Sequence, residues 1–242
     1  MSSAVFLSRL MLMLAVTFSP LMAVAAGEED DIDALRDKLG NEWVLVKNDR
    51  RREIKTWIKQ ETGKRFRSFK VESTIHASMT DFVRAIMDVE SYSRWYWEVR
   101  EARFLRRLSP AAFYVYIHHR APHGIPDRDV TNLIVITPQT TEQSTLKVEV
   151  RTITDLIPPK PPLVRMVAED MIARVTAVGP RKIHYVAEGY VDPGGVVPAW
   201  ASNSLQRIAP YQVVVGLKRM LESQEVRISD SPLPFPVREF GE

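Results

Sequence analysis

Alternation of apolar and polar residues marks much of this chain as half-buried β-strand. The alternation is clearest over residues 144–154, where Leu146, Val148 and Val150 are each followed by a charged residue. One face of such a strand packs on the core and the other faces solvent. Turn-forming residues separate the alternating segments at hairpin-like spacing, which favours an antiparallel sheet. The same period predicts strands at 43–47, 54–58, 66–75, 97–108, 112–119, 129–137, 164–178 and 182–191.

Two shorter segments repeat with the period of a helix instead. An acidic run at 28–31 precedes apolar residues spaced three and four apart, which predicts a short amphipathic helix over 32–39. Ser78 is a good N-cap for a second helix over 79–89. The buried stripe expected on that second helix consists of Phe82, Val83, Ile86 and Met87.

The most apolar helix is predicted near the C-terminus, over residues 198–222. Pro198 is suited to its first turn, whereas Pro210 lies inside it and should bend it. The helix carries more apolar surface than an ordinary solvent-facing helix, so it needs a concave partner. The Asp-Pro-Gly-Gly run at 192–195 precedes it and predicts a hinge, in which alanine at either glycine should slow the movement of the helix.

The first 26 residues have the character of a cleavable signal peptide. Arg9 precedes an apolar run at 10–16, and small residues at 23–26 suit signal-peptidase cleavage. A retained membrane anchor is the alternative, but the apolar stretch is short and contains Pro20. The chain also lacks cysteine, so we expect an exported protein without disulfides, in the periplasm of a Gram-negative bacterium.

Composition predicts one domain with a sizeable core. The chain has 242 residues, of which 45% are hydrophobic, and a net charge of +3 with acidic and basic residues interspersed. Such a charge pattern argues against nucleic-acid binding. We expect a domain over residues 27–223 and a Pro-rich tail over 224–242 that is extended and loosely attached.

An ordered set of short motifs resembles the START domains, the lipid-transfer domains related to the steroidogenic acute regulatory protein. The resemblance covers about residues 30–222 and implies an α+β helix-grip fold. In that fold a curved antiparallel β-sheet wraps around a long C-terminal α-helix, with an internal lipid-binding tunnel. The motifs include Trp43, the strand at 66–70, Asp88-Val89-Glu90 with Trp95, Pro126-Asp127-Arg128-Asp129, Pro162-Leu163-Val164-Arg165, and the segments 192–195 and 198–203.

The resemblance also leads us to expect particular residues at the tunnel. The expected gate or hinge consists of Asp127, Gly194, Gly195 and Pro198. Arg128 is the most suggestive polar residue, since its planar guanidinium suits a carboxylate or a lipid phosphate, or an ion pair that pins the loop to the sheet. The residues expected to contact the ligand are Tyr116, His118, Arg128, Val148, Arg165, Trp200, Asn203, Ile208 and Tyr211.

The sequence contains no recognisable catalytic or metal-binding motif. His118, His119 and His123 lie close together, but neighbouring residues on a strand point to opposite faces, so a zinc site is disfavoured. An enzyme related to polyketide cyclases and aromatases is an alternative that the fold resemblance allows. Its acid or base would be Tyr116, His118, Glu149 or Asp170. A third hypothesis is an adaptor that docks through residues 233–240.

The favoured hypothesis is a lipid carrier without a cofactor. Some sterol-binding relatives use a buried acid and arginine pair, but residues 130–136 contain no second arginine, so a glycerophospholipid or another acyl-chain ligand is favoured over a sterol. Sterol-like ligands such as hopanoids stay open as an alternative. The protein is expected to act as a monomer and to touch a membrane surface only transiently. Trp95, Tyr96 and Trp97 could insert there, although aromatic residues beside a turn more often cap a core.

Overall fold

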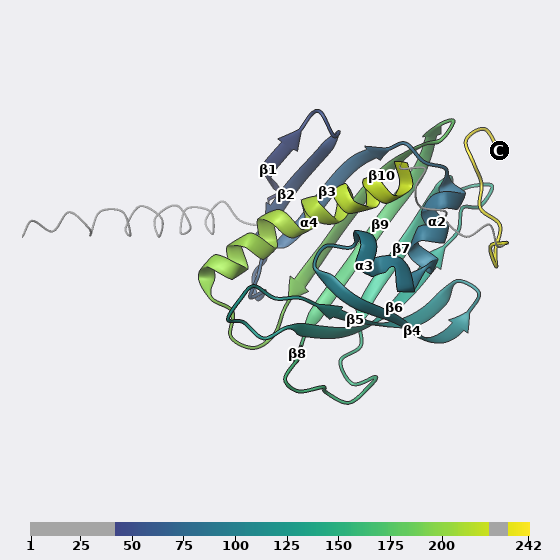
Figure 1. Cartoon of the computed structure of the whole chain (residues 1–242). Helices are drawn as coiled ribbons and strands as arrows, with labels where there is room; N and C mark the ends of the chain where they lie inside the picture. The colour runs from purple at the N-terminus through teal and green to yellow at the C-terminus, as the bar shows by residue number, and fades with distance from the viewer. Residues whose placement is uncertain (1–41, 223–231) are drawn as a thin grey trace, which may run out of the picture. The chain divides into compact units, whose positions relative to one another are not determined.

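The alternating segments form one large antiparallel sheet in the computed structural model, which describes residues 42–222 and 232–242 (Figure 1). Its order is β1-β2-β3-β10-β9-β7-β6-β5-β4, and the short strand β8 pairs in parallel with the start of β6. The strands are β1 (Val44–Asp49), β2 (Ile54–Lys59), β3 (Ser68–Ile75), β4 (Val99–Ser109), β5 (Ala112–His119), β6 (Arg128–Thr137), β7 (Thr145–Thr152), β8 (Val164–Arg165), β9 (Ala168–Gly179) and β10 (Lys182–Asp192).

Three α-helices accompany the sheet in the described part of the chain. They are α2 (Met79–Met87), α3 (Tyr92–Trp95) and α4 (Ala199–Glu222), with a single 3₁₀ turn (Val89–Ser91) before α3. Figure 1 shows the three helices on one face of the sheet, with α4 crossing it. The predicted α+β fold class is therefore confirmed. None of the described helices combines the length and hydropathy of a membrane-spanning helix.

Most predicted strands match the observed ones to within a few residues, and one prediction needs correction. The segment 164–178 is interrupted after Arg165, where the chain passes between two neighbours. The amide of Met166 donates to the backbone carbonyl of Asp129 at 2.9 Å, whereas the amide of Val167 donates to the backbone carbonyl of Asp192 at 2.9 Å. The predicted signal peptide and the helix over 32–39 lie outside the described residues.

Helix α2 closes one end of the core. Ser78 caps it as predicted, since its hydroxyl accepts a hydrogen bond from the amide of Asp81 at 3.0 Å. Phe82 and Val83 are fully buried, whereas Ile86 and Met87 are only partly buried against the same cluster. This end of the core is filled by side chains.

The C-terminal tail packs on the domain over residues 232–242, so the expectation of a loosely attached tail is wrong there. The Glu239 carboxylate accepts hydrogen bonds from the amides of Met79 and Thr80, at 3.0 and 2.9 Å. These amides belong to the first turn of α2, where a negative charge is favourable. Three alternate apolar side chains of the tail pack against the core, namely Leu233, Phe235 and Val237.

The C-terminal half of α4 is seated directly on α3. Four of its apolar side chains, Val214, Leu217, Met220 and Leu221, are buried. The close approach depends on Gly216, since a Cβ atom there would lie 1.9 Å from the carbonyl oxygen of Trp95. Only glycine allows the two backbones to come so near.

Gly216→Ala should therefore destabilise the fold, even though alanine is the better helix former. We expect a loss of about 1–3 kcal/mol, the usual cost of overpacking, measured as a lower urea midpoint of unfolding. Gly179→Ala is the matched control, because its Cβ would meet Lys182 at an ordinary 3.6 Å. Equal midpoints for the two variants would contradict the tight seat.

Candidate ligand-binding site

A cavity of about 560 Å³ lies between α4 and the sheet. Its walls come from β3, β9 and β10, from the end of β5, and from the loop that joins β5 to β6. The volume falls within the range of roughly 300–1,000 Å³ that is typical of small-molecule sites. Most of its wall is apolar and includes Phe69, Val71, Met166, Met171, Val191, Val197 and Val213.

The N-terminal half of α4 covers this cavity. Ala201, Leu205, Ala209 and Pro210 all face it. Pro210 has no N–H group, so the carbonyl of Gln206 loses the hydrogen-bond donor that a helix normally supplies. The half of α4 that covers the cavity therefore meets the half that packs on α3 at Pro210, where the hydrogen bonding of the helix is interrupted.

A buried carboxylate forms part of the polar wall of the cavity, which also includes Arg67, Arg120 and His123. Glu169 is 7% exposed and accepts hydrogen bonds from the Tyr96 hydroxyl at 2.7 Å and from the Asn132 amide at 2.6 Å. The Nε2 atom of His119 lies 3.2 Å from the same carboxylate, without the alignment of a hydrogen bond. Glu169, Tyr96 and His119 all line the cavity.

This environment keeps Glu169 ionised despite its burial. Desolvation raises the pKa of the carboxyl, but the electrostatic effect of the adjacent His119 and the hydrogen bonds from Tyr96 and Asn132 outweigh it, so the pKa is lowered overall. Burial raises the pKa of Tyr96 well above its usual value, and the adjacent Glu169 charge raises it further. Tyr96 therefore stays a neutral donor to the carboxylate.

Arg128 also lines the cavity, but its guanidinium is directed at backbone carbonyl groups. It donates to Pro193 at 3.4 Å, to Val196 at 3.5 Å and to Pro126. Burial lowers the pKa of Arg128. Of the roles expected for this residue, pinning a loop is the one observed, through carbonyl groups of two loops rather than through an ion pair.

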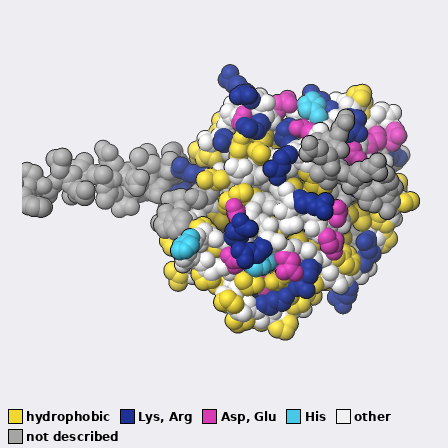
Figure 2. Space-filling view, in the orientation of Figure 1, with side chains coloured by type: hydrophobic (Ala, Val, Ile, Leu, Met, Phe, Trp, Pro, Cys, Tyr) yellow, Lys and Arg dark blue, Asp and Glu magenta, His cyan; other side chains and the backbone are white. Residues whose placement is uncertain are grey.

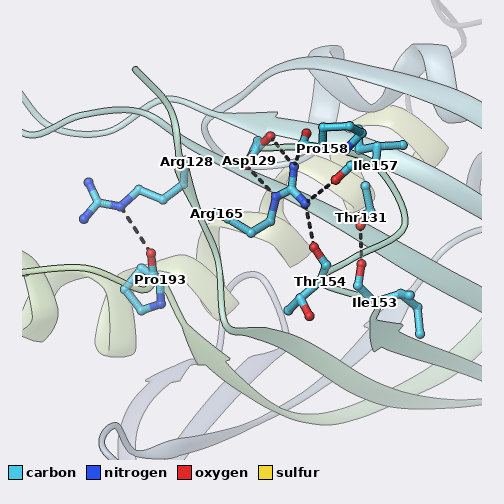
Figure 3. Close-up of polar contacts among 9 residues, drawn as sticks. All are labelled: Arg128, Asp129, Thr131, Ile153, Thr154, Ile157, Pro158, Arg165 and Pro193. Atoms are coloured by element: carbon cyan, nitrogen blue, oxygen red, sulfur yellow. Dashed lines mark hydrogen bonds and ion pairs between the residues drawn. The ribbon is translucent and has the colours of Figure 1, made fainter. Parts of the chain in front are cut away.

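Arg165 is a second pinning residue, and Figure 3 shows its side chain directed away from that of Arg128. It holds the buried Asp129 carboxylate through two hydrogen bonds of 2.8 and 3.0 Å. Its remaining donors reach the carbonyls of Thr154, Ile157 and Pro158 at 2.7, 3.0 and 3.2 Å. Arg165 thus fixes the 154–158 loop to the sheet and does not face the cavity.

The junction between β10 and α4 is held in a glycine-dependent shape. Gly194 and Gly195 have φ values of +66° and +58°, in the left-handed region. Asp192 accepts a hydrogen bond from the Gly194 amide at 2.9 Å, and Arg65 donates to the Gly195 carbonyl at 2.8 Å. Alanine at Gly194 would place Cβ 2.6 Å from the Arg165 carbonyl oxygen, so it would deform the junction instead of merely locking it.

Comparison with known proteins shows which fold this is. The chain superposes on a STAR-related lipid transfer protein fragment from Xanthomonas axonopodis with a TM-score of 0.65, 21% identity, and coverage of 75% of this chain and 99% of that one. It superposes on human StAR-related lipid transfer protein 5 with a TM-score of 0.63, 15% identity, and coverage of 82% and 94%. This chain has the START-like helix-grip fold.

Sequence comparison gives less information than structure comparison. An uncharacterized protein of Pseudomonas aeruginosa is 22% identical over 188 residues, which cover 77% of this chain and 90% of that protein. No protein-family model matches the chain. The resemblance expected from the short motifs is therefore confirmed at the level of the START-like fold.

Within this fold, several residues expected at the ligand lie elsewhere. Tyr116 and His118 occupy the opposite face of β5 from His119, with Tyr116 under Lys160 at 4.1 Å and His118 2.9 Å from Asp127. Tyr211 donates to Asp49 at 2.6 Å, away from the cavity lining.

The other expected residues also lie outside the cavity lining or have side chains that are not described. Val148 is buried in the filled part of the core, and Ile208 is 43% exposed outside the lining. Pro198 is exposed just before α4. Trp200 and Asn203 lie in α4, but their side chains fall outside the described part. Among the expected ligand contacts with described side chains, Arg128 alone lines the cavity.

The residues weighed for an enzyme or a metal site are also separated. Glu149 pairs with Lys147 at 3.0 Å and Asp170 is exposed, so neither lines the cavity. Of the three clustered histidines, His119 and His123 both line the cavity, whereas His118 lies on the opposite face of β5 against Asp127, as alternation on the strand predicts. Within residues 42–222 and 232–242, no three His, Cys, Asp or Glu side chains are grouped as a metal site requires.

The polar wall itself was missed from the sequence. A usable signal was present on β5, where His119 shares its face with the buried Phe113, Val115 and Ile117. A histidine that ends an inward-facing row is a candidate for a cavity wall. No comparable signal marks Glu169, which lies next to the exposed Asp170 and is brought to His119 only by the folding of the sheet.

Glu169→Gln should flatten the dependence of stability on acid pH. The lowered pKa of Glu169 means that its carboxylate stabilises the fold above the ordinary value near 4.5 and that this contribution is lost as the pH falls through the folded pKa. Urea unfolding at pH 7 and pH 4 should show a smaller loss on acidification in the variant. Glu149→Gln, on the outward face, controls for removal of one charge, and parallel losses in wild type and Glu169→Gln would refute the assignment.

Proposed function

We propose that the protein binds one hydrophobic, lipid-like ligand in the cavity beneath α4 and releases it by moving that helix. The observation that carries this proposal is the apolar cavity of about 560 Å³, covered by the half of α4 that precedes Pro210. Burial of a hydrocarbon chain there would contribute roughly 0.8 kcal/mol per methylene group. The expected glycerophospholipid is one candidate for the ligand.

The proposed gate is the junction at residues 192–198 together with the loop at 120–127. Arg128 and Arg65 hold the junction through the carbonyls of Pro193, Gly195 and Val196. When the mouth opens, water can replace the carbonyl groups as hydrogen-bond acceptors for the two arginines. Breaking these hydrogen bonds therefore leaves no buried charge without a partner. Opening therefore requires these two arginines to release the junction.

Exposed apolar residues near the junction support a transient membrane contact. Val196 is 89% exposed and Val167 is 58% exposed. Val167 lies beside Gly194, since its side chain would be 3.6 Å from a Cβ atom there. Elsewhere, Figure 2 shows basic and acidic side chains interspersed on the visible face, without one large basic patch. We propose that apolar contact, more than charge, brings the mouth to a membrane.

The residues weighed for the two alternative functions lie away from the cavity or pack on the domain itself. The acids and bases weighed for an enzyme do not line the cavity, and the apolar side chains of the tail at 233, 235 and 237 pack on its own domain. We propose further that the protein is exported to the periplasm, on the basis of the signal-like residues 1–26. We also propose that it acts as a monomer. Fractionation of a Gram-negative host should recover it in the periplasmic extract, and retention in the cytoplasm would refute export.

The binding proposal is tested by purifying the exported protein without detergent and identifying co-purified lipids by mass spectrometry. We expect one hydrophobic ligand per protein molecule. A matched variant, Ala209→Trp, should lower occupancy by filling the cavity under α4. Ligand-free wild-type protein that also fails to protect added lipid from extraction would refute the proposal.

Arg128→Lys should speed release of the co-purified ligand. Lysine cannot reach the separate carbonyls of Pro126, Pro193 and Val196 at once, so the junction should open more often. We expect release into phosphatidylcholine vesicles to accelerate by roughly threefold to tenfold, the effect of losing one or two hydrogen bonds. Arg151→Lys, on an exposed arginine paired with Glu149, is the control. An unchanged release rate would count against the arginine gate.

A further inference from the structure

The charged side chains that line the cavity gather at the end beneath the proposed gate. Glu169 pairs across strands with Val191, which directly precedes the junction at 192–198. His119 pairs with Arg128, whose guanidinium holds that junction. The other charged or titratable lining residues belong to the gate loop or directly precede β3 and β4: Arg67, Glu98, Arg120 and His123.

The lining becomes apolar and aromatic along β10, away from the gate. Inward-facing positions recur at every second residue of this strand, from Val191 to Tyr185. Between them lies Gly189, whose neighbours across the sheet, Phe69 and Met171, both line the cavity. Tyr185 lies six residues from Val191, which is about 20 Å along an extended strand. The cavity therefore has a charged end and an apolar end.

Tyr185 closes the apolar end against α2. Its ring centroid lies 6.1 Å from that of Phe82, which is completely buried. Val214 is the last residue of α4 in the lining, two residues before Gly216 reaches the carbonyl of Trp95. Figure 1 shows α2 and α3 beside this part of α4. The lining thus stops, on the sheet and on α4, where α2 and α3 begin to fill the core.

We propose that an amphiphilic ligand enters the cavity chain first, with its polar group left beneath the gate, and that Tyr185 limits the length of the chain. This inference rests on the proposed binding function and adds an orientation and a residue that selects the ligand. In this orientation hydrocarbon contacts apolar walls, and the polar group stays beside charged side chains.

The reversed orientation would carry the polar group to the far end of the cavity. Among the described side chains of the lining, only the Tyr185 hydroxyl could hydrogen-bond to it there. Burial of a polar group without enough partners is costly. The Tyr185 ring, in turn, cannot give way to a longer chain, because Phe82 fills the space behind it in a close-packed core.

The orientation is tested with two photoreactive lysophosphatidylcholines that differ only in the position of a diazirine group. One carries it at the end of the chain and the other beside the ester. Delipidated full-length protein is loaded with each probe from cyclodextrin and irradiated, and the labelled peptides are identified by mass spectrometry. We expect the first probe to label peptides that contain Tyr185 or Val214, and the second to label the loop at 120–127. A reversed pattern, or one pattern for both probes, would overturn the orientation.

The length limit is tested by competition among lauroyl, myristoyl, palmitoyl, stearoyl and arachidoyl lysophosphatidylcholines. Wild type should bind the chains better up to one length and worse beyond it. Tyr185→Ala should favour the next longer member over the wild-type optimum by about tenfold more than wild type does, the effect of burying two further methylene groups. Tyr185→Phe keeps the ring and should keep the wild-type optimum.

Phe113→Ala is a second control, because Phe113 is also buried but does not line the cavity. It should lower stability without moving the optimum. Far-UV circular dichroism and thermal unfolding confirm that each variant folds. If Tyr185→Ala does not fold, the milder Tyr185→Leu decides the question, since it also removes the ring and should move the optimum in the same direction.

The outcomes separate this inference from the binding proposal. An optimum that Tyr185→Ala leaves in place, or that Tyr185→Phe moves equally far, would overturn the length limit and leave hydrophobic binding intact. Failure of wild type to bind any member of the series would count against both. A longer optimum in Tyr185→Ala, with the wild-type optimum in Tyr185→Phe and Phe113→Ala, would support both.

Discussion

The seat of α4 on α3 is the contact on which the rest of this structure depends. Gly216 brings the helix backbone against the carbonyl of Trp95, and the apolar side chains around it are buried. With its C-terminal half held there, the half before Pro210 extends over a part of the sheet that none of the other described helices covers. The cavity is thus a consequence of one tightly packed crossing and of the interruption at Pro210.

Arginine in this protein mainly organises loops. Arg165 donates hydrogen bonds to Asp129 and to three carbonyl groups of the 154–158 loop. Arg128 and Arg65 hold the junction that leads into α4. The planar fork of a guanidinium can satisfy several carbonyl groups at once, which a lysine cannot. The mouth of the cavity consequently consists of irregular backbone whose carbonyl groups still accept hydrogen bonds.

Burial of the Glu169 carboxylate gives the cavity its chemical character. A charge so deep would be costly alone, and three neighbours offset that cost: Tyr96, Asn132 and His119. They come from the α3 to β4 connection and from two different strands.

Periodicity in the chain was enough to find nearly every strand, the cap at Ser78 and the long apolar helix, because those features depend on neighbours two to four residues apart. Short motifs were enough to predict the START-like fold. The ligand wall was a different matter, since Tyr116 and His118 differ from His119 only in which face of β5 they occupy, and Glu169 meets His119 across strands distant in sequence. Contacts of that kind are set by strand register and by the seating of α4, so only the tertiary structure could decide them.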